Sequence, residues 1–444
     1  MKLKKKFKID FKNKKLAING GSAVRKKKWP NNITTDNKEI SAVTKVLRNG
    51  NLSLFEGSFN AEAPFSFNGG PNVCNLENKW RKYYNCNYAV SMNSATSCLY
   101  AAIGSLNIGY GDEVIVSPFT MTACATAPLI YGAIPVFADV EPNTGCIDPE
   151  SFKKKISKRT KAIIVVHQFG IPANIRKILE IAKFNNIKVI EDCAQAHGAM
   201  FQGKFVGTFG DIGVFSLNVN KTIQSGEGGI CITNSKELDF RLRLIRNHGE
   251  AVVDSAKYKK ITNIVGFNYR MTELTAAVAI EQLKKLNKLN VYRIKLVNYF
   301  YNKIKKISFL ETIIRRPECN VCNCKLKCKS VFYIFPIKFI KKYINISRKI
   351  FSQICINEGI RFYEGYTKPL YLQSIYQKKK LFKFNYPFSA KENFLCNKSY
   401  SKGTCPQAEK LFYEEILINE DIRFPNKKED IDDIIKAINK IIEA

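Results

Sequence analysis

The sequence predicts an α/β protein with a large domain, whose central sheet is mostly parallel, and a smaller C-terminal α+β domain. Between about residues 85 and 235, short apolar, β-branched segments alternate with helical patterns, and from about residue 272 the pattern becomes mainly helical. Continuously apolar strands that alternate with helices are typical of a parallel sheet covered on both faces. Ligands of such sheets bind beyond the carboxyl ends of the strands.

The predicted strands are short apolar runs that end at polar residues or glycine. They are DEVIVSP (112–118), IPVFADV (134–140), KAIIVVHQFG (161–170), NIKVIEDCA (186–194), IGVFSLN (212–218) and GICITN (229–234). The helices predicted between them include residues 97–106, 125–133 and 175–186. A long amphipathic helix over residues 272–307 leads towards the smaller domain.

Three segments are expected along the chain. Residues 1–15 form a loose basic arm, residues 16–290 the large domain, and residues 291–444 the small domain. The small domain mixes a strand, SVFYIFPIKF (330–339), with helices over residues 346–359 and 429–442.

Composition limits the class of protein. The chain has 444 residues, and its 71 basic and 38 acidic residues give a net charge of +33. Such an excess is found in proteins that bind nucleic acid, but the lysines are spread along the chain rather than gathered in one stripe. We therefore favour a general enrichment in lysine, which still attracts anionic substrates. The sequence lacks a secretory signal and an apolar run of about 18 residues, so we expect a cytoplasmic protein without membrane or nucleic-acid partners.

Four of the 14 cysteines lie within ten residues, in the segment CNVCNCKLKC. They are Cys319, Cys322, Cys324 and Cys328. Four thiols in this space are able to bind zinc or an iron–sulfur cluster, but the spacing matches neither a zinc ribbon nor a ferredoxin. We expect a reduced loop and no metal.

Several polar residues follow the predicted strands. The three histidines, His167, His197 and His248, all lie at strand ends or beside glycine. The strand KVIED delivers Glu191 and Asp192 to its carboxyl end, and alternation along a strand points one carboxylate inward and the other elsewhere. A buried carboxylate needs a cation or hydrogen-bond donors, although an aspartate here is equally able to cap the following helix.

A lysine lies in an unusual setting in the segment FSLNVNKTIQSGEGG (215–229). Lys221 stands between an apolar strand and a glycine-rich turn, five residues after Ser216. The glycines let the main chain pass close to a ligand. Earlier in the chain, small hydroxylated residues in VSMNSATS precede an apolar helix, and free amides at a helix start bind phosphate, although simple capping is an alternative. The order of a P-loop is absent.

A lysine, a buried carboxylate and a phosphate cradle on an α/β sheet are the set that pyridoxal 5′-phosphate (PLP) requires. The lysine forms a Schiff base with the aldehyde, and the carboxylate keeps the pyridine nitrogen protonated so that the ring accepts electrons. The same lysine then moves protons as a general base and acid.

These motifs resemble the DegT/DnrJ/EryC1/StrS family, the fold-type I, PLP-dependent aminotransferases of nucleotide-sugar metabolism. The similarity covers nearly the whole chain. Its motifs are LAINGGSAVRKKKWP, NSATS, GDEVIVSPFTMTACATAPLIYGAIPVFADVEP, VIEDCAQAHGA, FSLNVNKTIQSGEGG, RNHGE and GFNYRMTELTAA, with weaker similarity in EGYTKPLYLQ and GTCPQAEKLF. The resemblance implies a homodimer with shared active sites.

The resemblance assigns roles to individual residues. Lys221 corresponds to the Schiff-base lysine and Asp192 to the partner of the pyridinium nitrogen, while Gln195 corresponds to the residue that bonds the phenolic oxygen. The phosphate would be held by the amides of Ala95 and Thr96, by Ser216, and by Asn268 of the neighbouring subunit. His167 and His248 match motifs near the pocket, and we expect them near the substrate.

Two positions depart from the family pattern. Met121 stands where many members place an aromatic residue over the cofactor ring, and a thioether is also able to cover a ring face. Ala95 stands where many members have glycine.

The leading hypothesis is an aminotransferase that takes an amino group from glutamate and passes it to a keto-sugar, such as a nucleotide-linked 4-keto or 3-keto sugar, or to a keto-cyclitol. One alternative is a PLP- or PMP-dependent sugar dehydratase of the same fold, although those relatives have histidine where this chain has Lys221. Another is a non-enzymatic regulator on the same scaffold, against which the intact set of Lys221, Asp192 and Ser216 argues.

Overall fold

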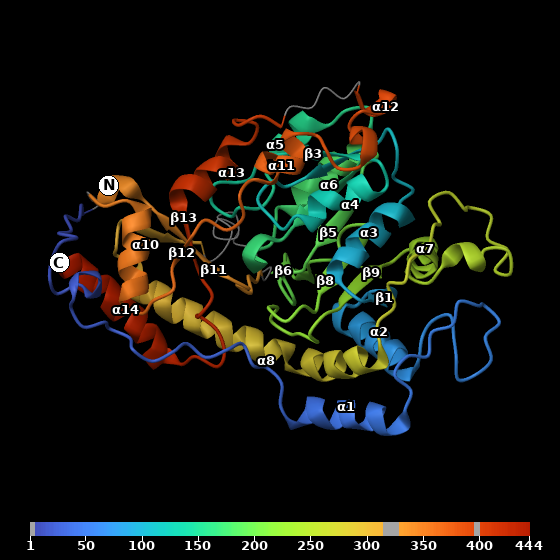
Figure 1. Ribbon diagram of the computed structural model, residues 1–444, viewed down its shortest axis with the longest axis horizontal. Coiled ribbons are helices and arrows are strands. Elements are labelled where there is room, and N and C mark those ends of the chain that lie inside the picture. The colour runs from blue at the N-terminus through green and yellow to red at the C-terminus, as the bar shows by residue number, and fades with distance from the viewer. Residues whose placement is uncertain (1–4, 314–327, 395–399) are drawn as a thin grey trace.

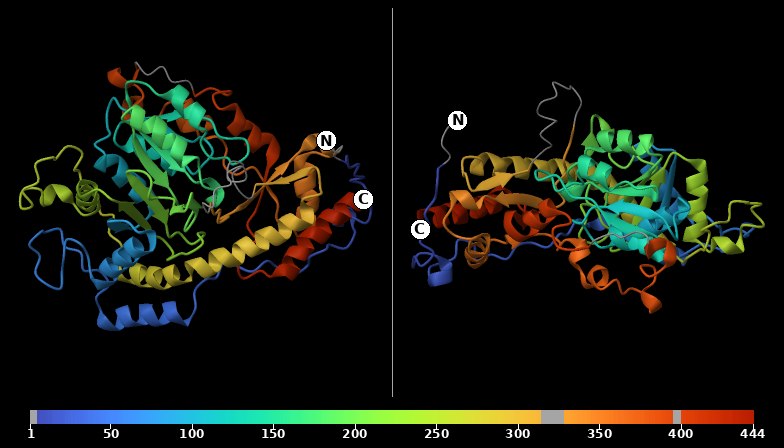
Figure 2. Two further views of the ribbon diagram at one scale, coloured as in Figure 1. Left: turned by 180° about the vertical axis from the view of Figure 1, so that it is seen from behind. Right: turned by 90° about the horizontal axis from the view of Figure 1, so that it is seen from above.

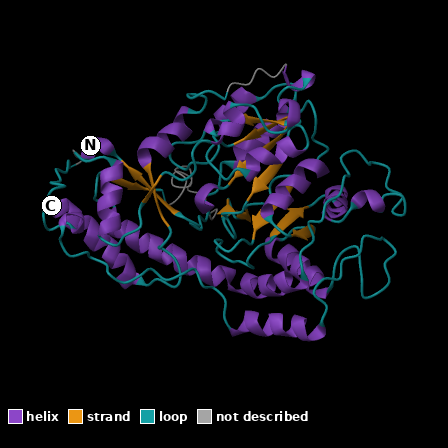
Figure 3. Cartoon of the chain, in the orientation of Figure 1, coloured by secondary structure: helices purple, strands orange, loops and turns teal. Residues whose placement is uncertain are grey.

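The computed structural model describes residues 5–313, 328–394 and 400–444. Figure 1 shows a larger lobe built around one sheet and a smaller lobe built around a second, with the long helix α8 (Glu273–Ile304) running beneath both. In Figure 3 the orange strands form two separate sheets among purple helices. The predicted α/β architecture, with a mostly parallel sheet and a smaller C-terminal α+β part, is confirmed.

The large sheet has seven strands in the order β1-β9-β8-β5-β4-β2-β3. The strands are β1 (Tyr88–Met92), β2 (Glu113–Val116), β3 (Ile134–Phe137), β4 (Thr160–Val166), β5 (Lys188–Asp192), β8 (Ile212–Ser216) and β9 (Gly229–Thr233). All neighbouring pairs are parallel except those of β9, which is antiparallel to both β1 and β8. The sequence prediction included every strand of this sheet except β1.

Helices cover both faces of this sheet because its strands are apolar on both sides. Ile164 and Ile190 belong to a core shared with α3 and α4, while the residues beside them, Ile163 and Val189, belong to a core shared with α2 and α6. The helices of this lobe are α1 (Asn37–Asn49), α2 (Pro71–Tyr84), α3 (Ala95–Ser105), α4 (Ala123–Ile130), α5 (Pro149–Lys155), α6 (Ile175–Phe184) and α7 (Lys236–Arg246). A small hairpin of β6 (Met200–Phe201) and β7 (Lys204–Phe205) lies beside the sheet.

Side-chain caps fix where several of these helices begin. Ser94, Asn174, Ser235 and Thr272 each accept a hydrogen bond from the first turn of the helix that follows. Asp36 and Glu39 form a reciprocal capping box at the start of α1.

The small lobe carries a four-stranded antiparallel sheet in the order β10-β11-β13-β12. Its strands are β10 (Leu310–Thr312), β11 (Phe335–Phe339), β12 (Tyr363–Glu364) and β13 (Ile416–Asn419). Its helices are α10 (Arg348–Asn357), α11 (Ser374–Gln377), α12 (Lys391–Phe394), α13 (Pro406–Lys410) and α14 (Lys428–Glu443). Short 3-10 turns are η1 (Ala17–Asn19), η2 (Gln168–Gly170), η3 (Gly249–Ala251), η4 (Lys341–Tyr343), η5 (Leu370–Leu372) and η6 (Lys383–Asn385), and η7 (Leu411–Glu415) is one π turn.

The expected domain limits meet two features of the structure. The limit between residues 290 and 291 falls inside the continuous helix α8. Residues 17–29, expected in the large domain, contact the small lobe, since Arg25 pairs with Asp430 of α14 and the Trp29 indole donates to the Gly359 carbonyl. Figure 2 shows this N-terminal stretch beside the C-terminal helix. The domain division itself stays a prediction.

The N-terminal arm was expected to be loose, but from residue 5 onward it packs against the small lobe. Its apolar residues account for this, because Phe7 stacks edge-on against Phe309 and Ile9 is buried. The side chain of Asn345 also holds Ile9, accepting from its N–H at 2.8 Å and donating to its C=O at 3.0 Å.

No helix among the described residues is long and apolar enough to cross a membrane.

Substituting Asn345 tests this attachment. We expect Asn345→Ala to lower the free energy of unfolding by about 1–2 kcal/mol, because two hydrogen bonds to Ile9 are lost, and to speed proteolysis of the arm. Asn357→Ala is the control, since the Asn357 side chain is exposed and bonds only within α10. Urea unfolding and limited proteolysis measure both effects, and equal behaviour of the two variants would contradict the attachment.

Candidate functional site

The carboxyl ends of three adjacent strands meet at one edge of the large sheet. Val166, the last residue of β4, pairs with Asp192 at the end of β5, and Asp192 in turn pairs with Val214 near the end of β8. Ser216 closes β8 opposite Gly229, the first residue of β9. The strand order therefore brings Asp192 and Ser216 to the same edge from parts of the chain that are far apart.

The start of helix α3 lies against this edge. A Cβ atom on Gly229 would approach the amide nitrogen of Ala95 to 2.5 Å, so only glycine permits this contact. The Ser94 side chain caps the amide of Ser97, which leaves the amides of Ala95 and Thr96 as the first donors of the helix without intrahelical acceptors. The Ser216 hydroxyl comes from the same edge, since Ser216 pairs with Gly229, and free amides at a helix start are a common setting for anions.

Asp192 is a buried carboxylate, with 6% of its surface exposed. Its Oδ1 accepts the N–H of Ala194 at 2.9 Å, and its Oδ2 accepts the thiol of Cys124 at 3.1 Å. Neither donor carries a charge. A buried carboxylate held only by neutral donors favours the arrival of a cationic group.

Lys221 provides the amine of the site. Its Nζ lies 4.3 Å from the centre of the Tyr333 ring, which comes from the segment that leads into β11. Burial lowers the pKa of Lys221 below its ordinary value, while the negative charges of Asp192 and Glu227 act in the opposite direction. Lys221 is therefore easier to deprotonate than a lysine in water, and Asp192 is near enough to influence it.

Glu191 lies beside Asp192 in the chain but has a different environment. Its Oε2 contacts His167 Nε2 at 3.0 Å and accepts the Gly207 amide at 2.8 Å, while Oε1 accepts the amides of Phe209 and Gly210, both at 2.7 Å. The predicted alternation thus gives one carboxylate that anchors a loop and one, Asp192, that faces the site.

His167 is also fully engaged inside the protein. Its Nδ1 accepts the amide of Ala173 at 3.0 Å, so its Nε2 carries the proton that is donated to Glu191. Both ring nitrogens are used, which leaves none for the substrate contact expected from the sequence.

His197, which the sequence analysis left without a role, packs between Trp80 and Phe215. Burial, followed by the charge of Lys221, lowers the pKa of His197 to about 3. Within the described part of the chain, no group bonds to its buried Nε2. The ring is therefore neutral, and it adds no positive charge beside the lysine.

Gln195 lies three residues after the end of β5. Its Oε1 accepts the Phe169 amide at 2.8 Å and its Nε2 donates to the Tyr366 hydroxyl at 3.1 Å. Ser216 Oγ accepts the amide of Asn218 at 3.3 Å, so its own proton is free to reach another acceptor.

Of the remaining predicted residues, Met121 and Asn268 are exposed and His248 is half-buried. Met121 is 52% exposed. Asn268 is exposed too; its Oδ1 accepts from Arg270 Nε at 2.8 Å and its carbonyl accepts from Asn93, two residues before α3. His248 adopts a left-handed conformation, with φ of 52°. The structure therefore places Asn268 near the start of α3, while a single chain does not bring Met121 or His248 into contact with Lys221.

Sequence reasoning missed Tyr333 and Tyr366. Both come from the small lobe, and both contact a predicted site residue, Lys221 and Gln195 respectively. The available signal was weak: Tyr366 stands inside the segment EGYTKPLYLQ, but Tyr333 is one of several aromatic residues in SVFYIF.

Of the cysteine cluster, Cys319, Cys322 and Cys324 lie outside the described residues. Cys328 is half-buried, and its sulfur accepts the amide of Gln202 at 3.4 Å. Elsewhere, the side chains of His167, Glu191 and Cys193 come within 4.8 Å of one another, but the first two already bond to each other and to main-chain amides.

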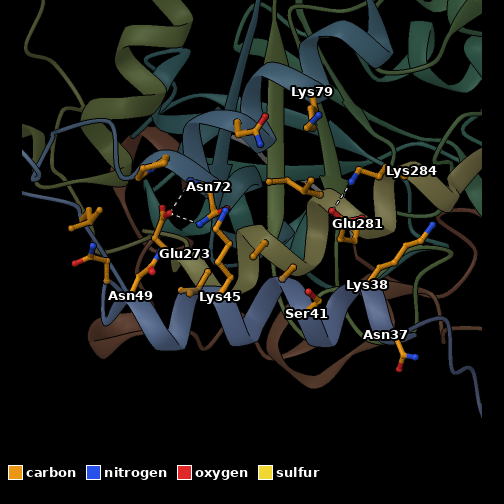
Figure 4. Close-up of a pocket in the computed structure, with 18 residues that line it drawn as sticks. Asn37, Lys38, Ser41, Lys45, Asn49, Asn72, Lys79, Glu273, Glu281 and Lys284 are labelled. Atoms are coloured by element: carbon orange, nitrogen blue, oxygen red, sulfur yellow. Dashed lines mark hydrogen bonds and ion pairs between the residues drawn. The ribbon is translucent and has the colours of Figure 1, made fainter.

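A separate hollow of about 810 Å³ lies between α1 and the helices α2 and α8. Figure 4 shows its polar lining, including Lys38, Lys45 and Lys79, with Glu273 turned towards Asn72. Glu273 accepts the amides of Asn72 and Val73 and so caps α2, which lacks a side-chain cap of its own. None of the predicted site residues lines this hollow.

The fold belongs to a known class of protein. The solved aminotransferase from Psychrobacter cryohalolentis superimposes with a TM-score of 0.77 at 26% identity, covering 93% of this chain and 98% of that one. The E. coli GDP-4-keto-6-deoxy-D-mannose-3-dehydratase, solved with bound hydrated PLP, gives a TM-score of 0.71 at 24% identity over 92% of this chain and 98% of that one, a likeness of fold alone. The fold is that of the fold-type I PLP-dependent transferases.

Sequence comparison then identifies the family. The model of the DegT/DnrJ/EryC1/StrS aminotransferase family matches residues 35–391. The chain therefore belongs to this family, as its motifs predicted.

Two curated relatives are similar over part of the chain. L-glutamine:2-deoxy-scyllo-inosose aminotransferase of Streptomyces kanamyceticus is 35% identical over 294 residues, 64% of this chain and 66% of that protein. GDP-perosamine synthase of Escherichia coli O157:H7 is 40% identical over 216 residues, 49% of this chain and 58% of that protein. The matched segments thus span less than two thirds of either relative.

The contrast between the two neighbouring carboxylates yields a test. We expect Glu191→Gln to lower the free energy of unfolding by about 2–4 kcal/mol, because an amide NH₂ then faces buried donors that the carboxylate accepted. Asp192→Asn is the matched control and should stay within about 1 kcal/mol of the wild type, since its oxygen still accepts the Ala194 amide. Urea unfolding of the two variants without cofactor measures both free energies. A larger loss of stability in Asp192→Asn than in Glu191→Gln would refute the assigned roles.

Proposed function

We propose that this protein is a PLP-dependent aminotransferase that moves an amino group from glutamate to a keto-sugar, in particular a nucleotide-linked 4-keto or 3-keto sugar. One observation carries the proposal: Lys221 and Asp192 reach the same sheet edge, where the Asp192 charge acts on an amine whose pKa is lowered by burial. We keep the expected cytoplasmic location as part of the proposal.

The residues at this edge fit PLP. The buried Asp192 has only neutral donors, as a partner for a protonated ring nitrogen requires, and the first amides of α3 with the Ser216 hydroxyl suit a phosphate. When bound, PLP supplies an electron-accepting ring that stabilises negative charge on the reacting carbon. Asp192 would hold the ring nitrogen, and Gln195 would bond the ring oxygen.

The remaining chemistry falls to Lys221. Because burial lowers its pKa, a larger share of its side chains is neutral near pH 7 than in an exposed lysine. The neutral Nζ is able to take a proton from the reacting carbon of the amino donor and to return it at the adjacent position, as general base and then general acid. The neutral His197 nearby keeps the pocket free of a second titrating cation at this pH.

The family relatives support the substrate class but differ in detail. The name of one specifies glutamine as donor and a keto-cyclitol as acceptor, and the name of the other specifies a GDP-linked amino sugar. The excess of positive charge on this chain suits a diphosphate-bearing acceptor. A sugar dehydratase is the second candidate, because an enzyme of that activity shares the fold.

A substrate screen tests the proposal. The purified protein with PLP is incubated with glutamate or glutamine and a panel of nucleotide-linked keto-sugars and keto-cyclitols. We expect one acceptor to gain the donor's nitrogen, with 2-oxoglutarate formed from glutamate, and Lys221→Ala to reduce turnover by about 10²–10⁴-fold because the proton carrier is lost. Mass spectrometry of the products gives the result, and Lys204→Ala, at an exposed lysine of β7, is the control.

The outcomes separate the candidates. Loss of water from a sugar without transfer of nitrogen would make the protein a dehydratase. The absence of both reactions, together with salt-sensitive retention on DNA, would favour the non-enzymatic alternative.

We further propose that the enzyme is a homodimer in which Asn268 completes the phosphate site of the partner subunit. The support is its exposure near the start of α3, with its side chain held by Arg270 rather than by a buried group.

Mixing inactive variants tests shared sites. When Lys221→Ala and Asn268→Ala dimers are dissociated and reassembled together, each hybrid has one intact site, so activity should return to roughly a quarter of the wild-type value. Lys221→Ala mixed with Asp192→Asn is the control, because both residues serve the same subunit and no intact site forms. Recovery in the control, or none in the first mixture, would count against the arrangement.

A further inference from the structure

A buried arginine bonds to the residue that follows Lys221 in the chain. Arg293, on α8, is only 5% exposed. Its Nη1 donates to the Thr222 hydroxyl at 2.9 Å and to the Phe332 carbonyl at 3.2 Å. Both acceptors are neutral, and burial, followed by the charge of Arg423, lowers the pKa of Arg293 to about 9. A buried guanidinium held by neutral acceptors is costly, so this position requires an explanation beyond packing.

The two acceptors flank the two groups that meet at the site. Thr222 follows Lys221 in the chain, and Phe332 precedes Tyr333, whose ring lies 4.3 Å from Lys221 Nζ. Phe332 has a φ of 52°, a conformation that a bulky residue rarely adopts without support from its surroundings. One nitrogen of Arg293 thus ties the turn that carries the lysine to the small-lobe segment that covers it.

The main chain supports this junction from the other side. The N–H of Tyr333 donates to the Phe169 carbonyl at 2.9 Å, and Phe169 in turn donates to Gln195. The segment over Lys221 is therefore fixed at two points, by the strand-end loop of the large lobe and by Arg293 of α8.

We infer that Arg293 is a positioning residue that bridges Thr222 and Phe332 and so keeps the amine of Lys221 against the ring of Tyr333. This role deepens the proposed function and rests on it. Arg293 bonds to neither Lys221 nor Asp192, so it acts through the two segments that it joins.

The consequence for Lys221 has a definite sign. Among the described residues, the titratable groups that act on its amine or lie against it are Asp192, Glu227, His197 and Tyr333. Burial is the largest influence on its pKa, and it favours the neutral amine. Loss of the bridge lets water reach the amine, so the pKa of Lys221 should rise towards its ordinary value.

The experiment measures this directly in the protein without cofactor. Acetylation of Lys221 by acetic anhydride is followed by peptide mass spectrometry as a function of pH, and the midpoint reports the pKa of the amine. We expect the midpoint to rise by about half a pH unit or more in Arg293→Gln and Arg293→Lys, which both lose the two-way bridge. A smaller rise is expected in Thr222→Val, and none in Thr222→Ser, which keeps the hydroxyl.

Arg241→Lys is the matched control. Arg241 is equally buried and also donates only to carbonyl and hydroxyl oxygens, but those belong to residues 104, 105, 258, 260 and 262. Its substitution should cost stability without moving the midpoint of Lys221. If the Arg293 variants do not fold, the comparison of Thr222→Val with Thr222→Ser decides the matter.

Two results would overturn the inference. One is a wild-type midpoint in both Arg293→Gln and Thr222→Val. The other is a wild-type midpoint in Arg293→Lys alone, because the charge and not the bridge would then be responsible. Failure of the proposed function is recognised separately, by wild-type protein that neither binds PLP nor transfers nitrogen. The acetylation midpoints of the variants are measured without cofactor, so they do not depend on that result.

Discussion

The site depends on one electrostatic constraint: a carboxylate is buried at the end of a central strand, and no cation of the described residues bonds to it. Asp192 has an amide and a thiol as its donors, and its charge acts on Lys221, an amine held where burial favours the neutral form. A cationic partner would offset the cost of burying such a carboxylate. The protein is therefore prepared for a ligand that is positive towards Asp192 and reactive towards Lys221.

The architecture separates this reactive edge from the groups that stabilise it. Successive carboxylates of one strand point to opposite faces. Glu191 therefore bonds to His167 and three main-chain amides, while the Asp192 carboxylate bonds to none of these groups. The small lobe adds two tyrosines to this edge: Tyr333 contacts Lys221, and Tyr366 bonds to Gln195. Helix α8 joins the two lobes, and its Arg293 lies where their segments meet, so the geometry of the amine depends on both lobes at once.

The features predictable from the sequence are those that a local residue pattern determines, namely the strands and the polar residues at their ends. Continuous apolar strands identified six of the seven strands of the large sheet, and the strand-end polar residues led to Asp192 and Lys221. The strand β1 was missed, because its residues run directly into the helix-start motif NSATS. The arm was expected to be loose because lysine dominates it, whereas Phe7 and Ile9 attach it to the small lobe. Tyr333 and Arg293 lie far from Lys221 in the chain, and no periodicity reveals a contact between lobes. His167 is the opposite case. Its motif indicates a residue near the substrate, but its two ring nitrogens bond to Glu191 and the Ala173 amide inside the protein.

The most direct measurement locates the cofactor on the chain. The protein is loaded with PLP, treated with borohydride to make the linkage permanent, and digested, and the peptides are sequenced by mass spectrometry. We expect a pyridoxyl group on Lys221 in the wild type, and far lower occupancy in Asp192→Asn, in which the ring nitrogen has lost its carboxylate partner. A pyridoxyl group on another lysine, or equal labelling of Lys221 when Asp192 is neutral, would contradict this expectation.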